Sequence, residues 1–458
     1  MNRTKINTLL SMLLSVACLA MAGIAQAGAL KVGAARVDIT SMAYPDGNIP
    51  ERSYAHEWLY VRAIVLDNGD AKAVLIGSDL SGIRPDTTYQ DASAAIAREF
   101  GIPAENVIMS GTHTHSGPRE HRDAAKISAA LLQATRAASA NMQPASVGFA
   151  EGKVYLNVNR DLFSDETGDW TQAPNPDGPS DKTLAVLAFY DAQGKPIAGY
   201  MNYAMHPVNG YLSNFRSGDF AGAASRHVEQ AFGDDMVMAF TQGASGDQNP
   251  LYLRNSTNVM AARIGVEING FDMTREAIET PLREELRPIV DNDPAADEAL
   301  KRWMDAQGQI MGEEAIRVMT RMNNLASDVE IGGQVATLTC PGRDRANSAE
   351  GRYGALPVYE DGPDVHLRLG VLTINNIALA SVNAEIYNVI AQQLKAASPL
   401  SNTMLVTVAN GRANSGYVPS DDAYGRRTFQ VLGSRLKPGC AQTGIVNAIT
   451  DLIYNDIN

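Results

Sequence analysis

Two histidines two positions apart are the residues best suited to chemistry in this chain. His113 and His115 lie in the segment Gly-Thr-His-Thr-His-Ser-Gly-Pro at residues 111–118, and the sequence holds only 7 histidines. Imidazole is the commonest metal ligand in proteins, and its unperturbed pKa lies near neutrality. The pair therefore indicates a metal or proton-transfer site. A polar turn with two solvated histidines fits this segment equally well when it is taken alone.

Four chemically equipped segments each follow an apolar run that predicts a buried strand. The predicted strand 107–110 is followed by His113 and His115, and the predicted strand 197–203 by His206. The predicted strand 236–240 is followed by the loop 243–250, and the predicted strand 377–382 by Glu385. In α/β sheets, ligands bind beyond the carboxyl ends of strands, so we expect these segments to meet. Histidines together with a carboxylate are the ligand set of a catalytic zinc site. Taken singly, His206 also fits a packed histidine, and Glu385 a stabiliser of a helix N-terminus.

The elements that must position these residues alternate between hairpins and strand–helix units. Strands are predicted at 60–66, 73–78, 107–110, 184–190, 197–203, 236–240, 367–374 and 377–382, and helices at 90–100, 122–140, 219–232 and 385–397. A helical region is predicted at 274–324 with an interruption at 291–296, and a surface loop at 163–182. This order predicts an α/β fold with a mixed β-sheet flanked by α-helices.

The N-terminus predicts export. Residues 1–27 begin with Arg3 and Lys5, continue with an apolar stretch and end in Ala-Gln-Ala, the pattern of a cleavable signal peptide. We therefore expect residues 28–458 to form the mature domain, in the periplasm or secreted. We expect no transmembrane segment, because no later stretch approaches the ~18–20 apolar residues that a span needs.

Composition narrows the range of partners. The chain is 45% hydrophobic and 19% charged, as in globular proteins, and its formal net charge is −13. An acidic surface argues against nucleic-acid binding and against charge-driven docking to an anionic bilayer. Beyond the signal peptide two cysteines remain, Cys340 and Cys440. A disulfide between them and two buried thiols are both compatible with the sequence.

Taken together, these motifs resemble the neutral/alkaline (non-lysosomal) ceramidase family, in its N-terminal catalytic domain. The resemblance extends from about residue 32 to about 424, and it rests on 32–40, 111–118, 157–160, 205–207, the Gly-Asp-x-x-Pro loop at 246–250, Glu385 and 415–418. It implies an α/β domain with a mixed sheet and one zinc ion in the active site. The zinc ligands that it implies are His113, His206, Glu385 and Tyr417. It further implies that His115 lies beside the zinc-bound water and that Arg160 contacts the substrate.

Two departures from the family bear on the mechanism. Asn249 stands where the ceramidases carry a serine in the Gly-Asp-x-x-Pro loop, and a carboxamide cannot be acylated as a serine can. A zinc-activated water remains as the nucleophile, with Asn249 as a hydrogen-bond donor to the substrate carbonyl. The chain also ends at Asn458, so we expect a ceramidase-like catalytic domain without the C-terminal β-sandwich. Asp219 and Asp247 are predicted either to accept hydrogen bonds from the ligand imidazoles or to cap a helix or turn.

The resulting hypothesis is an exported zinc-dependent amidohydrolase. It would cleave the amide bond of a small N-acyl substrate, such as a ceramide-like lipid. His115 would transfer the proton, while Asn249 and Tyr417 would stabilise the oxyanion. Two alternatives remain at this level: a zinc hydrolase of an ester or lactone, and a non-catalytic ceramidase-like binding protein.

Overall fold

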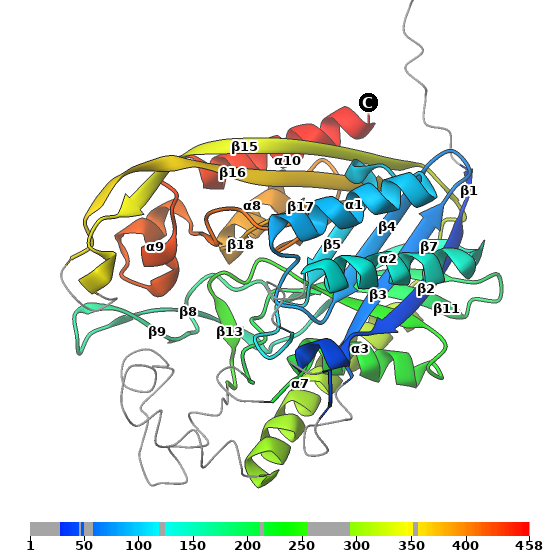
Figure 1. Ribbon diagram of the computed structural model, residues 1–458, viewed down its shortest axis with the longest axis horizontal. Coiled ribbons are helices and arrows are strands. Elements are labelled where there is room, and N and C mark those ends of the chain that lie inside the picture. The colour runs from blue at the N-terminus through cyan, green and yellow to red at the C-terminus, as the bar shows by residue number, and fades with distance from the viewer. Residues whose placement is uncertain are drawn as a thin grey trace, which may run out of the picture.

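The structure is a computed structural model, and it describes residues 28–44, 47–49, 58–118, 124–210, 215–253, 294–350 and 356–457. Its three largest sheets share one plan, in which a hairpin is followed by a helix and a parallel strand (Figure 1). The three units are β3–β4–α1–β5, β10–β11–α3–β12 and β16–β17–α8–β19. In each unit the parallel pair joins the second and third strands: β4 with β5, β11 with β12, and β17 with β19. These mixed sheets with helices confirm the α/β prediction.

Further strands extend each of these sheets. The first sheet has the order β5 (Val107–Gly111), β4 (Lys72–Ser78), β3 (Tyr60–Asp67), β2 (Lys31–Asp38) and β6 (Gln143–Pro144). The second has the order β12 (Val237–Gln242), β11 (Pro196–Tyr203), β10 (Thr183–Tyr190) and β7 (Ser146–Lys153). The third has the order β15 (Ile331–Arg345), β16 (Tyr359–Ile374), β17 (Ile377–Val382) and β19 (Asn402–Val406). β15 and β16 form the long hairpin that crosses the top of Figure 1.

One central core joins the inner faces of all three sheets. Residues of each sheet contribute to it, among them Ile64, Leu187 and Leu372. Because side chains alternate along a strand, the other residues of the same strands face outward. Three outer clusters cover these outward faces: α1 (Asp86–Phe100) and α2 (Ala124–Ala140) on the first sheet, α3 (Asp219–Ala231) and α7 (Pro294–Thr320) on the second, α8 (Asn388–Ala397) and α10 (Ala441–Ile457) on the third.

Smaller sheets complete the described part of the fold. β13 (Gln248–Pro250) pairs with β8 (Asn157–Ser164), which pairs with β9 (Asp169–Asn175), and β1 (Gly28–Ala29) pairs with β14 (Asp328–Val329). β9 corrects the prediction of a loop at 163–182, because Asp- and Pro-rich residues concealed a strand held by β8. The two-residue strands β18 (Glu385–Ile386) and β20 (Tyr417–Val418) also pair. The prediction that a helix begins at Glu385 is therefore wrong, because Glu385 lies in β18 and α8 begins at Asn388. The short helix α9 spans Phe429–Gly433.

Two further features bear on the predictions from the sequence. Cys340 and Cys440 form a disulfide that joins β15 to the residue before α10. α7 lies within the predicted helical region, whose first part, 274–293, falls outside the described residues. Among the helices that the structure describes, none has the length and apolar character needed to cross a membrane.

Candidate metal centre

Each of the three units places one residue at the candidate site, and this residue occupies the same position in each unit. The third residue after the second strand of each unit is Ser81 after β4, His206 after β11 and Glu385 after β17. His113 follows β5, the parallel neighbour of β4, by two residues. The carboxyl ends of these strands therefore converge, as the sequence predicts for α/β sheets.

The loop that carries His113 adopts an unusual backbone conformation. His113 has φ 67°, a left-handed value that residues other than glycine rarely adopt. Its N–H donates to the Leu80 carbonyl (3.0 Å), and the N–H of His115 donates to the Pro207 carbonyl (3.1 Å). These bonds hold the turn and tie it to the loop that carries His206. Strained backbone of this kind persists where the surrounding structure fixes it, often at functional sites.

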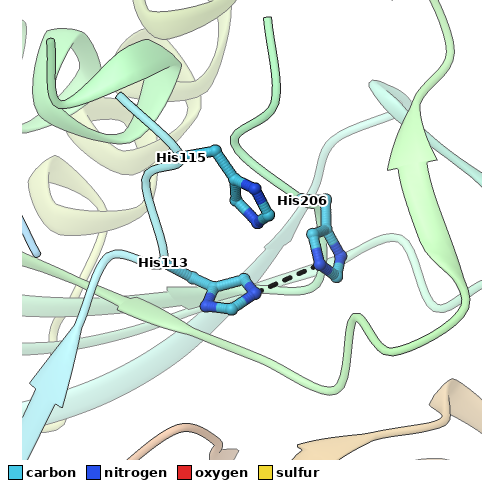
Figure 2. Close-up of side chains that lie close together, drawn as sticks. All are labelled: His113, His115 and His206. Carbon is cyan, nitrogen blue, oxygen red and sulfur yellow. Dashed lines mark hydrogen bonds between the residues drawn. The ribbon is translucent and has the colours of Figure 1, made fainter. Parts of the chain in front are cut away.

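Hydrogen bonds to backbone carbonyls fix the orientation of two imidazoles. Nδ1 of His113 donates to the Ser81 carbonyl and Nδ1 of His206 to the Ser245 carbonyl, each over 2.7 Å. Because a carbonyl oxygen only accepts, the proton of each neutral ring lies on Nδ1 and leaves Nε2 as an acceptor. The two Nε2 atoms lie 3.1 Å apart and point toward one another (Figure 2).

Glu385 adds a third acceptor to the same point. Its Oε2 lies 3.2 Å from Nε2 of His113 and 3.3 Å from Nε2 of His206. Three acceptors facing one another with no donor between them form an arrangement that a bound cation would stabilise. Two ligand atoms bound about 2.0–2.1 Å from one tetrahedral zinc ion are roughly 3.3 Å apart, so the observed spacings fit a shared divalent ion. His113, His206 and Glu385 are hereafter called the acceptor cluster.

His115 brings a third imidazole to the acceptor cluster. Ligating atoms of His113, His115 and His206 all lie within 4.8 Å of one another, so the three histidines could hold a metal ion. The ring centroid of His115 is 5.1 Å from that of His113 and 5.7 Å from that of His206 (Figure 2). Unlike the other two, His115 is exposed at the surface. This position suits either a further ligand or a base that exchanges protons with solvent.

Local electrostatics favour the protonation states that a cation needs. Burial, followed by the charge of Arg160, lowers the pKa of His206 to about 3, so its ring is neutral at physiological pH. The surrounding protein and then the neighbouring imidazoles lower the pKa of His115. Burial alone would raise the pKa of Glu385, but His113 and His206 hold it well below its usual value. Glu385 is therefore ionised.

Arg160 links the predicted substrate-binding residues to one another. Its guanidinium donates to the Gly246 carbonyl (2.6 Å), to Oδ1 of Asn249 (3.1 Å) and to the phenol oxygen of Tyr417 (3.4 Å). It also lies 4.9 Å from the ring centroid of Phe429 and is almost fully buried. Arg160 therefore holds Asn249 and Tyr417 in place. Its predicted contact with substrate stays a prediction.

Asn249 presents a buried donor beside this arginine. Because Oδ1 accepts from Arg160, the amide orientation is fixed and Nδ2 is the free end. Nδ2 is buried and has no hydrogen-bond partner within the described part of the chain. A buried donor left without a partner costs free energy, and a ligand that accepted this hydrogen bond would remove that cost.

Tyr417 lies beside Glu385, since β18 and β20 pair these two residues in register. Burial of the phenol and the negative charge of Glu385 raise the pKa of Tyr417, so it keeps its proton at neutral pH. In this state it is a hydrogen-bond donor. The predicted role of Tyr417 as a metal ligand stays a prediction.

The acceptors of the ligand imidazoles are not the two aspartates suggested by the sequence. Asp219 accepts from Asn209 (2.7 Å) and from the N–H of Phe220 (2.7 Å) at the start of α3. Asp247 accepts from Asn159 (2.8 Å) and from the N–H of Asn388 (2.8 Å). Both aspartates therefore have structural roles. The carbonyls that orient the imidazoles belong to Ser81 and Ser245, and main-chain atoms leave no signal in residue types.

Comparison with known proteins places this site in a family. The family model described as neutral/alkaline non-lysosomal ceramidase, N-terminal, matches residues 31–259, which is half of the chain. The chain belongs to this ceramidase family. The matched segment contains five of the predicted site residues, namely His113, His115, Arg160, His206 and Asn249. Glu385 and Tyr417 lie beyond it.

Individual relatives carry the same family name. Neutral ceramidase B of Dictyostelium discoideum is 30% identical over 169 residues, 32% of this chain and 24% of the relative. Neutral ceramidase of Pseudomonas aeruginosa is 27% identical over 249 residues, 48% of this chain and 35% of the relative. The matched segments thus span about a quarter to a third of these ceramidases.

The likeness in fold extends further than the likeness in sequence. A crystal structure of neutral ceramidase from Pseudomonas aeruginosa superposes with a TM-score of 0.65 and 17% identity, covering 93% of this chain and 74% of that one. A ceramidase structure complexed with C2 gives the same TM-score at 16% identity. The ceramidase fold therefore includes the part of the chain that carries Glu385 and Tyr417.

Proposed function

We propose that this protein is a zinc-dependent amidohydrolase that cleaves the amide bond of an N-acyl substrate. The observation that carries the proposal is the acceptor cluster, in which Nε2 of His113, Nε2 of His206 and Oε2 of Glu385 face one another at 3.1–3.3 Å. Two relatives named neutral ceramidases support an amide of the ceramide type as the substrate class. A bound zinc ion would polarise the substrate carbonyl and lower the pKa of a water molecule to about 7.

His115 is the proton carrier in this proposal. Its lowered pKa leaves the ring neutral and able to accept a proton from the attacking water. The oxygen of that water forms a bond to the acyl carbon. As the carbon–nitrogen bond breaks, His115 returns the proton to the leaving nitrogen, so the products are a carboxylic acid and an amine.

Asn249 and Tyr417 would stabilise the charge that develops on the carbonyl oxygen. Nδ2 of Asn249 is a buried donor without a partner, and the phenol of Tyr417 keeps its proton. Arg160 fixes both groups through its guanidinium, so neither has to reorient during the reaction. Donors held in place in this way stabilise a transition state more strongly than water does.

We also propose that the protein is exported. The support is the signal-peptide pattern of residues 1–27 and the disulfide between Cys340 and Cys440, because disulfides persist in oxidising compartments. Detection of the mature chain in the periplasmic or secreted fraction, with its N-terminus near residue 28, would test this. A chain found only in the cytosol with residues 1–27 intact would refute it.

The test of the proposed activity combines metal content with turnover. Wild type, His113→Ala and Glu385→Gln are purified and analysed for bound metals by mass spectrometry, then assayed on ceramide, simpler N-acyl amides, and matched esters and lactones. We expect about one zinc per chain and amide hydrolysis in the wild type, and neither in the two variants. His227→Ala is the matched control, since this surface histidine pairs with Glu313 (2.8 Å).

Three outcomes would contradict the proposal. Turnover that persists without any divalent metal would remove the metal from the mechanism. Cleavage of esters or lactones but not amides would show that the enzyme hydrolyses a carbon–oxygen bond and not an amide bond. Zinc binding without hydrolysis of any member of the panel would point to a binding protein.

A further inference from the structure

A small hollow opens beside the acceptor cluster. His113 and Glu385 line it together with Gly82, Arg84, Arg412 and Gly416. Its volume is about 20 Å³, and a cavity needs roughly 10–15 Å³ to hold one water molecule. The hollow therefore accommodates a small polar group and is too small for an acyl chain.

Glycines leave the wall of the hollow open. A Cβ added at Gly82 would meet no atom within 4 Å. A Cβ added at Gly416 would meet only Nη2 of Arg412, at 3.4 Å. Because Gly416 directly precedes Tyr417, this contact places the Arg412 guanidinium next to the predicted site.

The lining of the hollow carries the guanidinium of Arg412 beside the carboxylate of Glu385. The side chain of Arg412 is exposed, and its guanidinium makes no ion pair with any residue that the structure describes. The neighbouring carboxylate of Asp86 is engaged elsewhere: it accepts two bonds from Arg368 (2.8 and 3.0 Å) and one from the Arg412 backbone N–H (3.3 Å). The Arg84 guanidinium also lines the hollow, where it donates to Oγ of Ser81.

We propose that the substrate carries a carboxylate close to the scissile amide, and that Arg412 recognises it. The preferred substrate is then an N-acyl amino acid. This inference rests on the proposed amide hydrolysis, and it assigns an amino acid as the amine product in place of the amino alcohol that a ceramide-type amide would release.

The small volume of the hollow and its position beside the acceptor cluster favour a carboxylate over larger anions. His113 and Glu385 line both the hollow and the acceptor cluster, so a group in the hollow lies only a few bonds from the reacting carbonyl. In an N-acyl α-amino acid the carboxylate carbon is two bonds from the amide nitrogen. A guanidinium pairs with a carboxylate through two parallel hydrogen bonds. Water adds its hydroxyl to the acyl carbon and its proton to the nitrogen, releasing a fatty acid and a free amino acid.

The test compares two substrates that differ only in charge, N-dodecanoylglycine and N-dodecanoylglycinamide. We expect wild-type kcat/KM to be about ten- to a hundredfold higher for the carboxylate, the range expected for a hydrogen bond to a charged group. Arg412→Gln should bring the ratio of the two values close to one, and Arg412→Lys should restore part of it. Arg98→Gln, on the exposed last turn of α1, is the matched control and should keep the wild-type ratio.

A binding measurement separates this inference from the proposed function. Wild type and Arg412→Gln are titrated calorimetrically with N-dodecanoylglycine, and we expect the variant to bind at least about tenfold more weakly. Hydrolysis of both substrates at equal rates would overturn the inference and leave the amidohydrolase proposal standing. If neither substrate is cleaved, the titration decides: weaker binding by Arg412→Gln supports the carboxylate site, and equal binding overturns it.

Discussion

Two buried clusters of charged or ionisable side chains in this protein are built on opposite principles. In the first, the Arg62 guanidinium donates to Glu229 (2.8 and 3.2 Å) and to Asp79 (3.1 Å), and Arg36 also donates to Glu229 (2.8 Å), so two cations balance two anions within the chain. The second is the acceptor cluster, where Glu385 and two imidazoles meet without any donor. The first cluster is closed and structural, whereas the second presents acceptors that a cation from outside could bridge.

The largest effect is expected from breaking the closed cluster. Arg62→Met should lower the free energy of unfolding by about 3–5 kcal/mol, because it leaves Asp79 buried without a cation and Glu229 with Arg36 alone. Denaturant unfolding measures this loss. Arg36→Gln is the control, since Arg36 also bonds Glu229 (2.8 Å) but is partly exposed, and it should cost less. A loss under about 1 kcal/mol in Arg62→Met would show that the cluster is not structural.

The next effect concerns the donor held near the acceptor cluster. Asn249→Ala should lower kcat by about a hundred- to a thousandfold, which is about 2.7–4 kcal/mol of transition-state stabilisation. Zinc content should remain that of the wild type. An increase in KM of the same size with unchanged kcat would mean that Asn249 stabilises the bound substrate and the transition state equally.

Metal addition probes the acceptor cluster itself. Zinc at about a hundred times its dissociation constant should raise the free energy of unfolding of metal-free wild type by about 2.7 kcal/mol. Glu385→Gln should show little of this gain, because a neutral amide replaces the anionic acceptor. Thermal unfolding with and without zinc measures the difference. An equal gain in both proteins would place the ion somewhere else.

The smallest effect on stability is expected at the partly exposed ion pair between Asp86 and Arg368. Burial would raise the pKa of Asp86, but Arg368 holds it below the usual value. The stabilisation from this carboxylate is therefore complete above its unfolded pKa, near 4, and is lost as pH falls through the lower folded value. Asp86→Asn should flatten the acid limb of a stability–pH curve, by less than about 1 kcal/mol because solvent screens the pair. A steeper acid limb in Asp86→Asn would contradict this sign.

Much of the fold could be predicted because most hairpin strands of the three units are nearly continuous apolar runs, although β16 is so only in its second half. β10 and β11, for example, are buried along almost their whole length and coincide with the predicted strands. β15 escaped prediction, since it alternates partly exposed threonine, glycine and glutamine along a surface hairpin. β9 was hidden among turn-forming residues. Strands that owe their conformation to a paired neighbour leave little signal in their own residues.

The candidate site divides in the same way. The convergence of His113, His206 and Glu385 follows from a rule about the ends of strands, so residue order was enough to predict it. The pairing of Glu385 with Tyr417 depends on two short strands 32 positions apart, as the register Glu385 with Tyr417 shows. The hollow beside Arg412 depends on the space that glycines leave open. Such features arise from tertiary packing and are absent from local sequence.

The disulfide between Cys340 and Cys440 closes a ring of chain that contains Glu385, Arg412 and Tyr417 but leaves His113 and His206 outside. A cross-link over 100 residues lowers the conformational entropy of the unfolded chain. In the simplest polymer treatment this stabilises the folded state by about 4.7 kcal/mol. Thiol reductants would therefore loosen the carboxylate side of the candidate site while the imidazole side stays anchored in its own sheets. If the proposed function holds, formation of the complete site would depend on oxidation of a bond remote from it.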